Sequence, residues 1–389
     1  MSHAHSMPIR WLSLAIALGS IAALPGCDLG IDLSGPGPDR SVPEVHGRHI
    51  SSAHRSTPIT WSPSGEEVTF ISGDLRMAYA YHPQSGAMRQ LYASNTLRDR
   101  IRDAQLSADG VDWFTISRYV GDTVGPNVVR RHTSAGSTVL TDRGGAHSLR
   151  NPPLMRWVLV APSQPVVAFI VSPDSLFLLR RGGEPTLLGS GCYGVVAFSP
   201  DESRVLCRVS GTSVISSVAG GIFPPSLRPT FRVFRMDGGA AESLDLPDEV
   251  AEEAQVIRWD AQGIQVLYSA YDERFSDGWG YLLYEQASGS SRPLSPAYQS
   301  EFTTGKMSWS SDGRKVAYWN SFCAQSAGLF GGCSKTQVFL YVLDVATGTT
   351  TRVAVHTSTG VRDYRVAVSP TGSMVGYIVN DGFYLLDVR

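Results

Sequence analysis

The chain has 389 residues, of which 39 are Gly and 23 are Pro, while only 17% are charged. This composition favours many short strands joined by tight turns over surface helices rich in Glu and Lys. The formal net charge is −2 and no Lys- or Arg-rich block occurs, which argues against nucleic acid as a partner.

The N-terminal residues have the pattern of an export signal. Arg10 precedes an apolar segment over residues 11–24. That segment is shorter than the roughly 20 apolar residues of a membrane-spanning helix, and it ends in small residues just before Cys27. We therefore expect residues 1–26 to be a cleaved signal peptide.

The end of this segment, Leu24-Pro25-Gly26-Cys27, resembles the lipobox of bacterial lipoproteins, although Pro25 departs from the residue types usual there. The resemblance implies that Cys27 becomes lipid-modified and carries enough acyl chains for stable attachment to a membrane. The alternative is an ordinary secretory signal with an incidental cysteine. Residues 27–43 are expected to be a flexible tether, and the expected location is the bacterial cell envelope, facing the periplasm or the exterior.

One short pattern recurs about seven times along the rest of the chain, at a mean spacing of about fifty residues. An apolar run leads into a turn of the type Ser-Pro-Asp-Gly, in which Pro presets φ and Gly tolerates a positive φ. Strict alternation of large apolar residues follows, and in most copies two further strand-like runs come next. The copies begin at Ile59, Asp103, Val158, Val195, Val256, Met307 and Val366. Four antiparallel strands per repeat form the blade of a β-propeller.

The copy from Trp309 to Thr349 shows the pattern most clearly, as "WSSDGRKVAYW" and then "LYVLDVATGT". It resembles the TolB-type, WD40-like propeller repeat, and the resemblance implies one all-β propeller domain over residues 44–389. In the second and third copies, Ala108 replaces the proline and Ser163-Gln164 replaces Asp-Gly. Seven blades are expected, with six or eight as the alternatives.

The last copy ends at "GFYLLDVR" and lacks a fourth strand. Because a bare sheet edge invites pairing with other chains, we expect the segment Glu44–Ser52 to supply the missing outer strand and to close the ring. The alternative is that this segment belongs to the tether. Residues three apart on a strand face opposite sides, so His46, His49 and the nearby His54 predict no metal site.

Four of the cysteines are candidates for disulfides. Cys323 and Cys333 bracket "AQSAGLFGG" between two strand-like runs, and a bridge there would close a short loop. Cys192 and Cys207 flank another hairpin without having to lie opposite each other, so their pairing stays open. Such bridges are typical of an oxidising compartment, and the alternative is that all four are reduced, buried hydrophobic residues.

No catalytic motif is found in the sequence. The Gly-x-Ser-x-Gly motif of serine hydrolases is absent, and no segment remains that could hold an α/β-hydrolase domain. We therefore expect neither an enzyme nor a cofactor.

Recognition is predicted on three long loops. The Ser-Pro-Asp-Gly turns occupy one rim of the propeller, so the connections between second and third strands share the other rim. Three of these connections are long and contain apolar candidates for binding: Ile222, Phe223, Phe275, Trp279, Leu329 and Phe330. Aromatic side chains of this kind favour interface cores, but the loops could equally fold over the ring and bury them.

The sequence thus predicts a monomeric, lipid-anchored, non-catalytic propeller that binds an envelope protein or peptide. One alternative is a propeller enzyme of the lyase or glycosidase type, with acidic residues in the central channel. The other is a purely structural surface lipoprotein.

Overall fold

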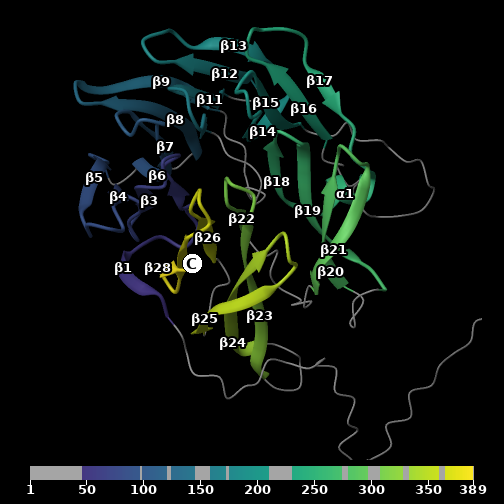
Figure 1. Ribbon diagram of the computed structural model, residues 1–389. Coiled ribbons are helices and arrows are strands. Elements are labelled where there is room, and N and C mark those ends of the chain that lie inside the picture. The colour runs from purple at the N-terminus through teal and green to yellow at the C-terminus, as the bar shows by residue number, and fades with distance from the viewer. Residues whose placement is uncertain are drawn as a thin grey trace, which may run out of the picture. The chain divides into compact units, whose positions relative to one another are not determined.

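The structure is a computed structural model. It describes residues 46–96, 99–120, 124–144, 158–171, 175–209, 230–273, 279–296, 307–326, 333–358 and 364–388. Within these residues the strands form seven antiparallel sheets of four strands each, and Figure 1 shows the sheets following one another around a ring. This is a seven-bladed β-propeller, and the predicted fold is confirmed. In the described ranges the only α-helix is α1 (Asp248–Glu252), and no helix there has the length and hydropathy of a membrane span.

Each blade contributes one strand to each of four concentric positions. The innermost strands are β2 (Thr60–Trp61), β6 (Asp99–Leu106), β10 (Val158–Val160), β14 (Cys192–Phe198), β18 (Ala254–Asp260), β22 (Met307–Trp309) and β26 (Arg365–Val368). The second strands are β3 (Val68–Ile71), β7 (Trp113–Val120), β11 (Val166–Val171), β15 (Arg204–Val209), β19 (Gly263–Tyr271), β23 (Lys315–Ser326) and β27 (Met374–Val379).

The outer half of each blade consists of a third and a fourth strand. The third strands are β4 (Met77–Tyr81), β8 (Val124–Thr133), β12 (Ser175–Arg180), β16 (Thr230–Arg235), β20 (Trp279–Glu285), β24 (Cys333–Asp344) and β28 (Gly382–Asp387). The fourth strands are β5 (Met88–Ala93), β9 (Gly136–Gly144), β13 (Thr186–Gly189), β17 (Glu242–Leu244), β21 (Ser290–Pro296), β25 (Thr350–Ser358) and, in the seventh blade, β1 (Arg48–Ser52). Blades are numbered here from β2 onward.

The core consists of seven apolar clusters, each lying between two neighbouring blades. Alternation along the strands divides each blade between its two neighbours. On β23, for example, Tyr318 packs toward the fifth blade, whereas Ala317 and Trp319 pack toward the seventh. Trp309 lies against the same cluster as Tyr318.

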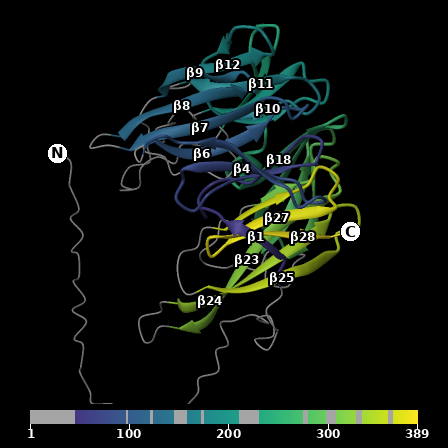
Figure 2. The same ribbon diagram turned by 90° about the vertical axis from the view of Figure 1, so that its left-hand side faces the viewer.

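The ring is closed by the N-terminal strand, as predicted. β1 pairs antiparallel with β28, from Arg48 opposite Leu385 to Ser52 opposite Gly382, and Figure 2 shows the two strands side by side. At the inner strands, the Trp61 indole N–H of the first blade donates to the carbonyl of Ala367 in the seventh, with an N···O distance of 3.0 Å.

A buried serine organises five of the turns between first and second strands. Its hydroxyl accepts the N–H five residues later, and the fourth residue of the turn has a positive φ. The serines are Ser62, Ser107, Ser199, Ser310 and Ser369. Glycine occupies the positive-φ position in four of these turns, including Gly313 at +78°, whereas the fourth-blade turn has Glu202 at +53°. The turn within "WSSDGRKVAYW", at residues 310–313, is therefore present.

Candidate functional site: an axial cavity between the seven inner strands

The two rims of the ring carry different connections. We call the rim with the turns at residues 62–67, 107–112, 161–165, 199–203, 261–262, 310–314 and 369–373 the turn rim. The opposite rim, which includes the described connections at 53–59, 72–76, 245–253 and 380–381, is the loop rim.

An axial cavity of about 400 Å³ lies between the inner strands and extends to the turn rim. Its wall includes turn residues such as Pro63, Pro162, Ser311 and Pro370. Every blade contributes the apolar residue at the turn-rim end of its inner strand, a set that we call the apolar ring. Its members are Trp61, Leu106, Val160, Phe198, Trp259, Trp309 and Val368. These residues line the cavity and also pack in the clusters between blades. The volume is within the range of about 300–1,000 Å³ that is usual for ligand sites.

Hydrogen bonds fix two indoles of the apolar ring, and a cation–π contact fixes the third. Trp61 is held by the bond to Ala367 described above, and the Trp309 N–H donates to the Gly313 carbonyl at 3.1 Å. The Arg204 guanidinium lies over the indole of Trp259, with its central carbon 5.1 Å from the ring centroid. These aromatic surfaces are therefore positioned before any ligand arrives.

The cavity wall is close to neutral. Arg258 is the one charged residue among the described lining residues, and its guanidinium donates to the carboxylate of Asp260, to the side chain of Gln265 and to the carbonyl of Ser311. The same guanidinium lies over the indole of Trp309, 5.9 Å from the centroid. The described wall contains no Asp, Glu, His, Cys or Tyr side chain.

Polar groups of the wall also join neighbouring blades. The Gln105 amide donates to the carbonyl of Val158 at 2.6 Å, and its oxygen accepts the N–H of Val160 at 3.3 Å. Ser308 accepts the N–H of Val368 at 2.9 Å. The arrangement offers apolar and aromatic surface with fixed hydrogen-bonding groups, which suits binding rather than general acid–base chemistry.

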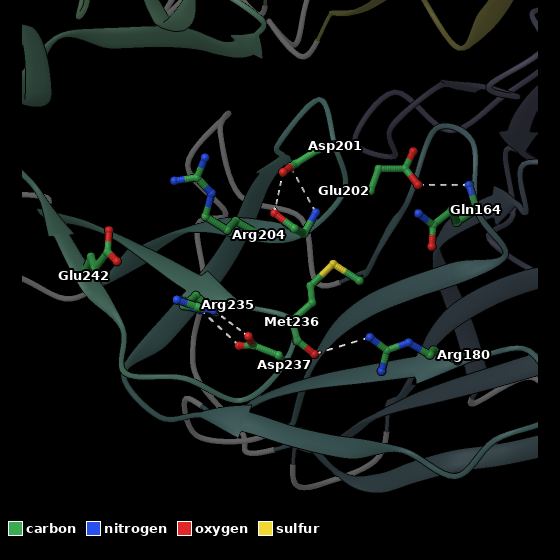
Figure 3. A pocket seen from close by; sticks show the side chains of 10 residues that line it. Gln164, Arg180, Asp201, Glu202, Arg204, Arg235, Met236, Asp237 and Glu242 are labelled. Atoms are coloured by element: carbon green, nitrogen blue, oxygen red, sulfur yellow. Dashed lines mark hydrogen bonds and ion pairs between the residues drawn. The ribbon is translucent and has the colours of Figure 1, made fainter.

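A second pocket, of about 530 Å³, lies on the turn rim between the third and fourth blades (Figure 3). Its charged side chains are mostly satisfied by the protein itself: Arg235 pairs with Asp237 at 2.6 Å, and Arg180 donates to the carbonyl of Met236 at 3.4 Å. Hydrogen bonds from Ser199 and then Ser203 lower the pKa of Asp201 to about 2.

Glu202 also lines this second pocket, where Figure 3 shows it next to Gln164. Its carboxylate accepts the backbone N–H of Ser163 and that of Gln164, so it links the fourth blade to the third. We therefore assign the second pocket a structural role.

The structure does not place the side chains of the binding residues predicted from the sequence. Ile222, Phe223, Phe275, Leu329 and Phe330 fall outside the described residues, as does Cys27. Trp279 begins β20 with its backbone opposite Tyr271, but its side chain is outside the description. The long-loop face therefore stays a prediction.

Of the two predicted cysteine pairs, the structure describes one as a disulfide and does not describe the side chains of the other. Cys192 and Cys207 form a disulfide across β14 and β15, with their Cα atoms 5.5 Å apart. β23 continues through Cys323 to Ser326, and β24 begins at Cys333, so this hairpin is longer and its loop shorter than predicted. The side chains of Cys323 and Cys333 are not among those described.

The three histidines near the closing strand lie in different surroundings. The His46 and His356 side chains are 2.9 Å apart, His49 packs edge-on against Tyr384, and the Nδ1 atom of His54 is 2.8 Å from the Ser56 hydroxyl. In the part of the chain that the structure describes, no three His, Cys, Asp or Glu side chains are placed to hold a metal ion together.

Known structures share this fold at low sequence identity. A chain in the crystal structure of the mitotic checkpoint complex is 12% identical with a TM-score of 0.53, covering 98% of this chain and 100% of its own length. Oligogalacturonate lyase from Vibrio parahaemolyticus is 12% identical with a TM-score of 0.52, at 90% and 92% coverage. A chain of Kuenenia stuttgartiensis hydrazine synthase is 12% identical with a TM-score of 0.50, at 89% and 99% coverage. No family model and no curated protein sequence matches the chain. These similarities show the propeller fold alone.

Proposed function

We propose that the protein is a lipid-anchored, non-catalytic propeller of the bacterial cell envelope that binds an extended peptide or protein segment at the axial cavity. The observation that carries this proposal is the neutral wall with its apolar ring, because desolvated aromatic pockets account for much of the affinity of protein interfaces. Within the described wall, Arg258 is already neutralised by Asp260, so the cavity favours apolar, aromatic or proline side chains over charged ones.

The envelope location has support of its own. The Cys192–Cys207 disulfide is buried in the fourth blade, and disulfides persist mainly in exported proteins. The lipobox-like segment supplies the proposed anchor at Cys27. If the anchor exists, the full-length chain enters the detergent phase of a detergent-phase separation and the Cys27→Ser chain stays in the aqueous phase.

Binding at the cavity is tested with a defined probe. Peptides selected on the purified propeller from a random peptide library are titrated against the wild type and against Trp259→Ala. Loss of an aromatic anchor costs more than about 1.4 kcal/mol, so we expect affinity to fall at least about tenfold. The comparison variant is Phe275→Ala, in one of the three long loops predicted from the sequence, and it should leave the affinity unchanged if the axial cavity is the site.

The same experiment separates the alternatives. If the peptides lose affinity for a variant with Phe223, Phe275 and Phe330 replaced together, and not for Trp259→Ala, the site lies on the long loops predicted from the sequence. Failure to select any peptide would favour a purely structural lipoprotein and would contradict the proposal.

A second candidate function is a polysaccharide lyase or glycosidase, because one protein with the same fold is an oligogalacturonate lyase. Against it, the described wall of the axial cavity contains no carboxylate, whereas glycosidases ordinarily require a pair. We expect the purified protein to leave oligogalacturonate intact, and release of unsaturated oligosaccharide would overturn the non-catalytic proposal.

A further inference from the structure

Three arginines gather in the second blade at the loop rim. Arg100 in β6 lies opposite Arg118 in β7 in the strand pairing. Arg102 follows two residues later, where the register shifts between Ile101 and Asp103. Such a bulge changes the direction of a side chain relative to regular alternation. The three side chains therefore come from neighbouring positions at one end of two adjacent strands.

The three guanidinium groups interact electrostatically. Burial lowers the pKa of Arg102, and the neighbouring Arg118 and Arg100 lower it further. Burial also lowers the pKa of His54, against the opposing influence of Asp381, and Arg102, Arg55 and Arg100 each lower it further. Arg55 belongs to the same connection between β1 and β2 as His54, so guanidinium groups from two parts of the chain act on the His54 ring.

The nearby carboxylates have other partners. Asp99 pairs with Arg130 at 3.4 Å, and Asp381 pairs with Arg55 at 3.7 Å. The carboxylate of Asp103 accepts a hydrogen bond from the Gln105 amide at 3.0 Å. Among the described residues, no carboxylate forms an ion pair with Arg100, Arg102 or Arg118.

A fourth arginine lies at the same rim. The Arg365 guanidinium, at the start of β26, donates to the carbonyl of Ser56 at 2.7 Å, two residues from His54. Burial lowers the pKa of Arg365 to about 10. The connection at 53–59 is thus flanked by guanidinium groups from the second and seventh blades.

Clustered guanidiniums without counter-charges destabilise a fold, because like charges repel and partly buried cations lose hydration. A guanidinium also presents a fork of donors that matches the oxygens of a carboxylate or phosphate. Arg100 is exposed, and Arg102 and Arg118 are partly exposed, so a ligand can reach them from solvent.

We propose that Arg100, Arg102 and Arg118, with His54 beside them, form a binding site for the carboxylate or phosphate group of an anionic ligand on the loop rim. The site is separate from the axial cavity and does not depend on the function proposed there. An anion would neutralise the group and remove its mutual repulsion.

The test is thermal unfolding of the propeller with inorganic phosphate or succinate, compared with chloride at the same ionic strength. A ligand that binds only the folded state raises the unfolding temperature with concentration. We expect such a rise for the wild type with at least one of the two anions. The anion that stabilises more tells whether the ligand carries phosphate or carboxylate.

Arg102→Gln should weaken this response by about tenfold in apparent affinity, because it removes a charge-assisted contact. Without anion, the variant should be at least as stable as the wild type, since it has one like charge fewer. The matched control is Arg314→Gln on the turn rim, where the side chain is 81% exposed, and it should keep the full response.

Two results would overturn the proposal: an equal response in Arg102→Gln, or the same rise with chloride. If Arg102→Gln does not fold, Arg100→Gln replaces it, because Arg100 is exposed and its replacement leaves the core intact.

Discussion

Glu202 holds the backbone of Ser163 across the boundary between the fourth and third blades. Its carboxylate accepts the Ser163 N–H at 2.5 Å and the Gln164 N–H at 3.0 Å, while its own backbone has a φ of +53°. The third-blade turn lacks the buried serine that organises five of the other turns. A side chain from the next blade supplies the acceptor that this turn does not contain.

Replacing Glu202 should therefore destabilise the propeller. Glu202→Ala removes two hydrogen bonds to a carboxylate and keeps a strained backbone, so the free energy of unfolding should fall by about 2–3 kcal/mol. Glu202→Gly removes the same carboxylate but relieves about 1 kcal/mol of backbone strain. Its free energy of unfolding should therefore lie between those of Glu202→Ala and the wild type. Denaturant unfolding of the three chains measures the order, and equal losses for Gly and Ala would contradict the strain at this position.

Removal of the closing strand should destabilise the ring and promote self-association. A chain that begins at Ala53 lacks β1, so the backbone of β28 becomes an open sheet edge. Loss of the ladder hydrogen bonds, at about 1 kcal/mol each, should lower the free energy of unfolding by about 3 kcal/mol or more. Light scattering and thermal unfolding test this against a chain that begins at Glu44, and a monomer of unchanged stability would show that β1 is dispensable.

Reduction of the Cys192–Cys207 disulfide should lower the free energy of unfolding by about 3 kcal/mol, the value expected for a closed loop of this length. The two cysteines are 15 residues apart in the sequence and completely buried. Denaturant unfolding with and without reductant gives the difference. In the Cys192→Ala, Cys207→Ala double variant the reductant should have no such effect, and an equal effect there would place the sensitivity elsewhere.

His132 should make the propeller less stable in acid. Its side chain is 3% exposed and stacks on Trp113, and burial, with a smaller effect of Arg130, lowers its pKa from 6.5 to about 4. The unfolded chain then takes up the proton first, so stability present above pH 6.5 is lost as the pH falls toward about 4, by roughly 1–3 kcal/mol. His132→Phe should lose less stability over this interval, and an unchanged pH dependence would exclude His132 as the cause.

The blade count and the closing strand were predictable because both depend on local patterns. Alternation and turn residues recur within each copy, and the missing fourth strand of the last copy required a partner from elsewhere in the chain. Of the expected segment Glu44–Ser52, residues Arg48–Ser52 form the strand. Even the atypical copies at Ala108 and Ser163 keep enough alternation to form complete blades.

The sites were harder to predict because they depend on which residues different blades bring together. The apolar residue before each turn was visible in every copy, but a strand buried on both faces does not reveal which side chain faces the axis. The sequence pattern places the start of the second copy at Asp103, whereas β6 begins at Asp99, so Arg100 and Arg102 fall outside the predicted repeat. The spacing of Arg100 and Arg102, two residues apart on a strand, was the available signal. The role of Glu202 depends on a contact with another blade that no local pattern contains.

The pairing of β1 with β28 also sets the order of events during folding. The two partners lie at opposite ends of the propeller domain, β1 at Arg48–Ser52 and β28 at Gly382–Asp387. The loop between them spans almost the whole domain, so its closure is entropically unfavourable until the intervening blades have packed. The first six blades can form in sequence, but the seventh is completed only when β28 is present to pair with β1. Premature termination anywhere before Gly382 therefore leaves an open ring rather than a smaller propeller.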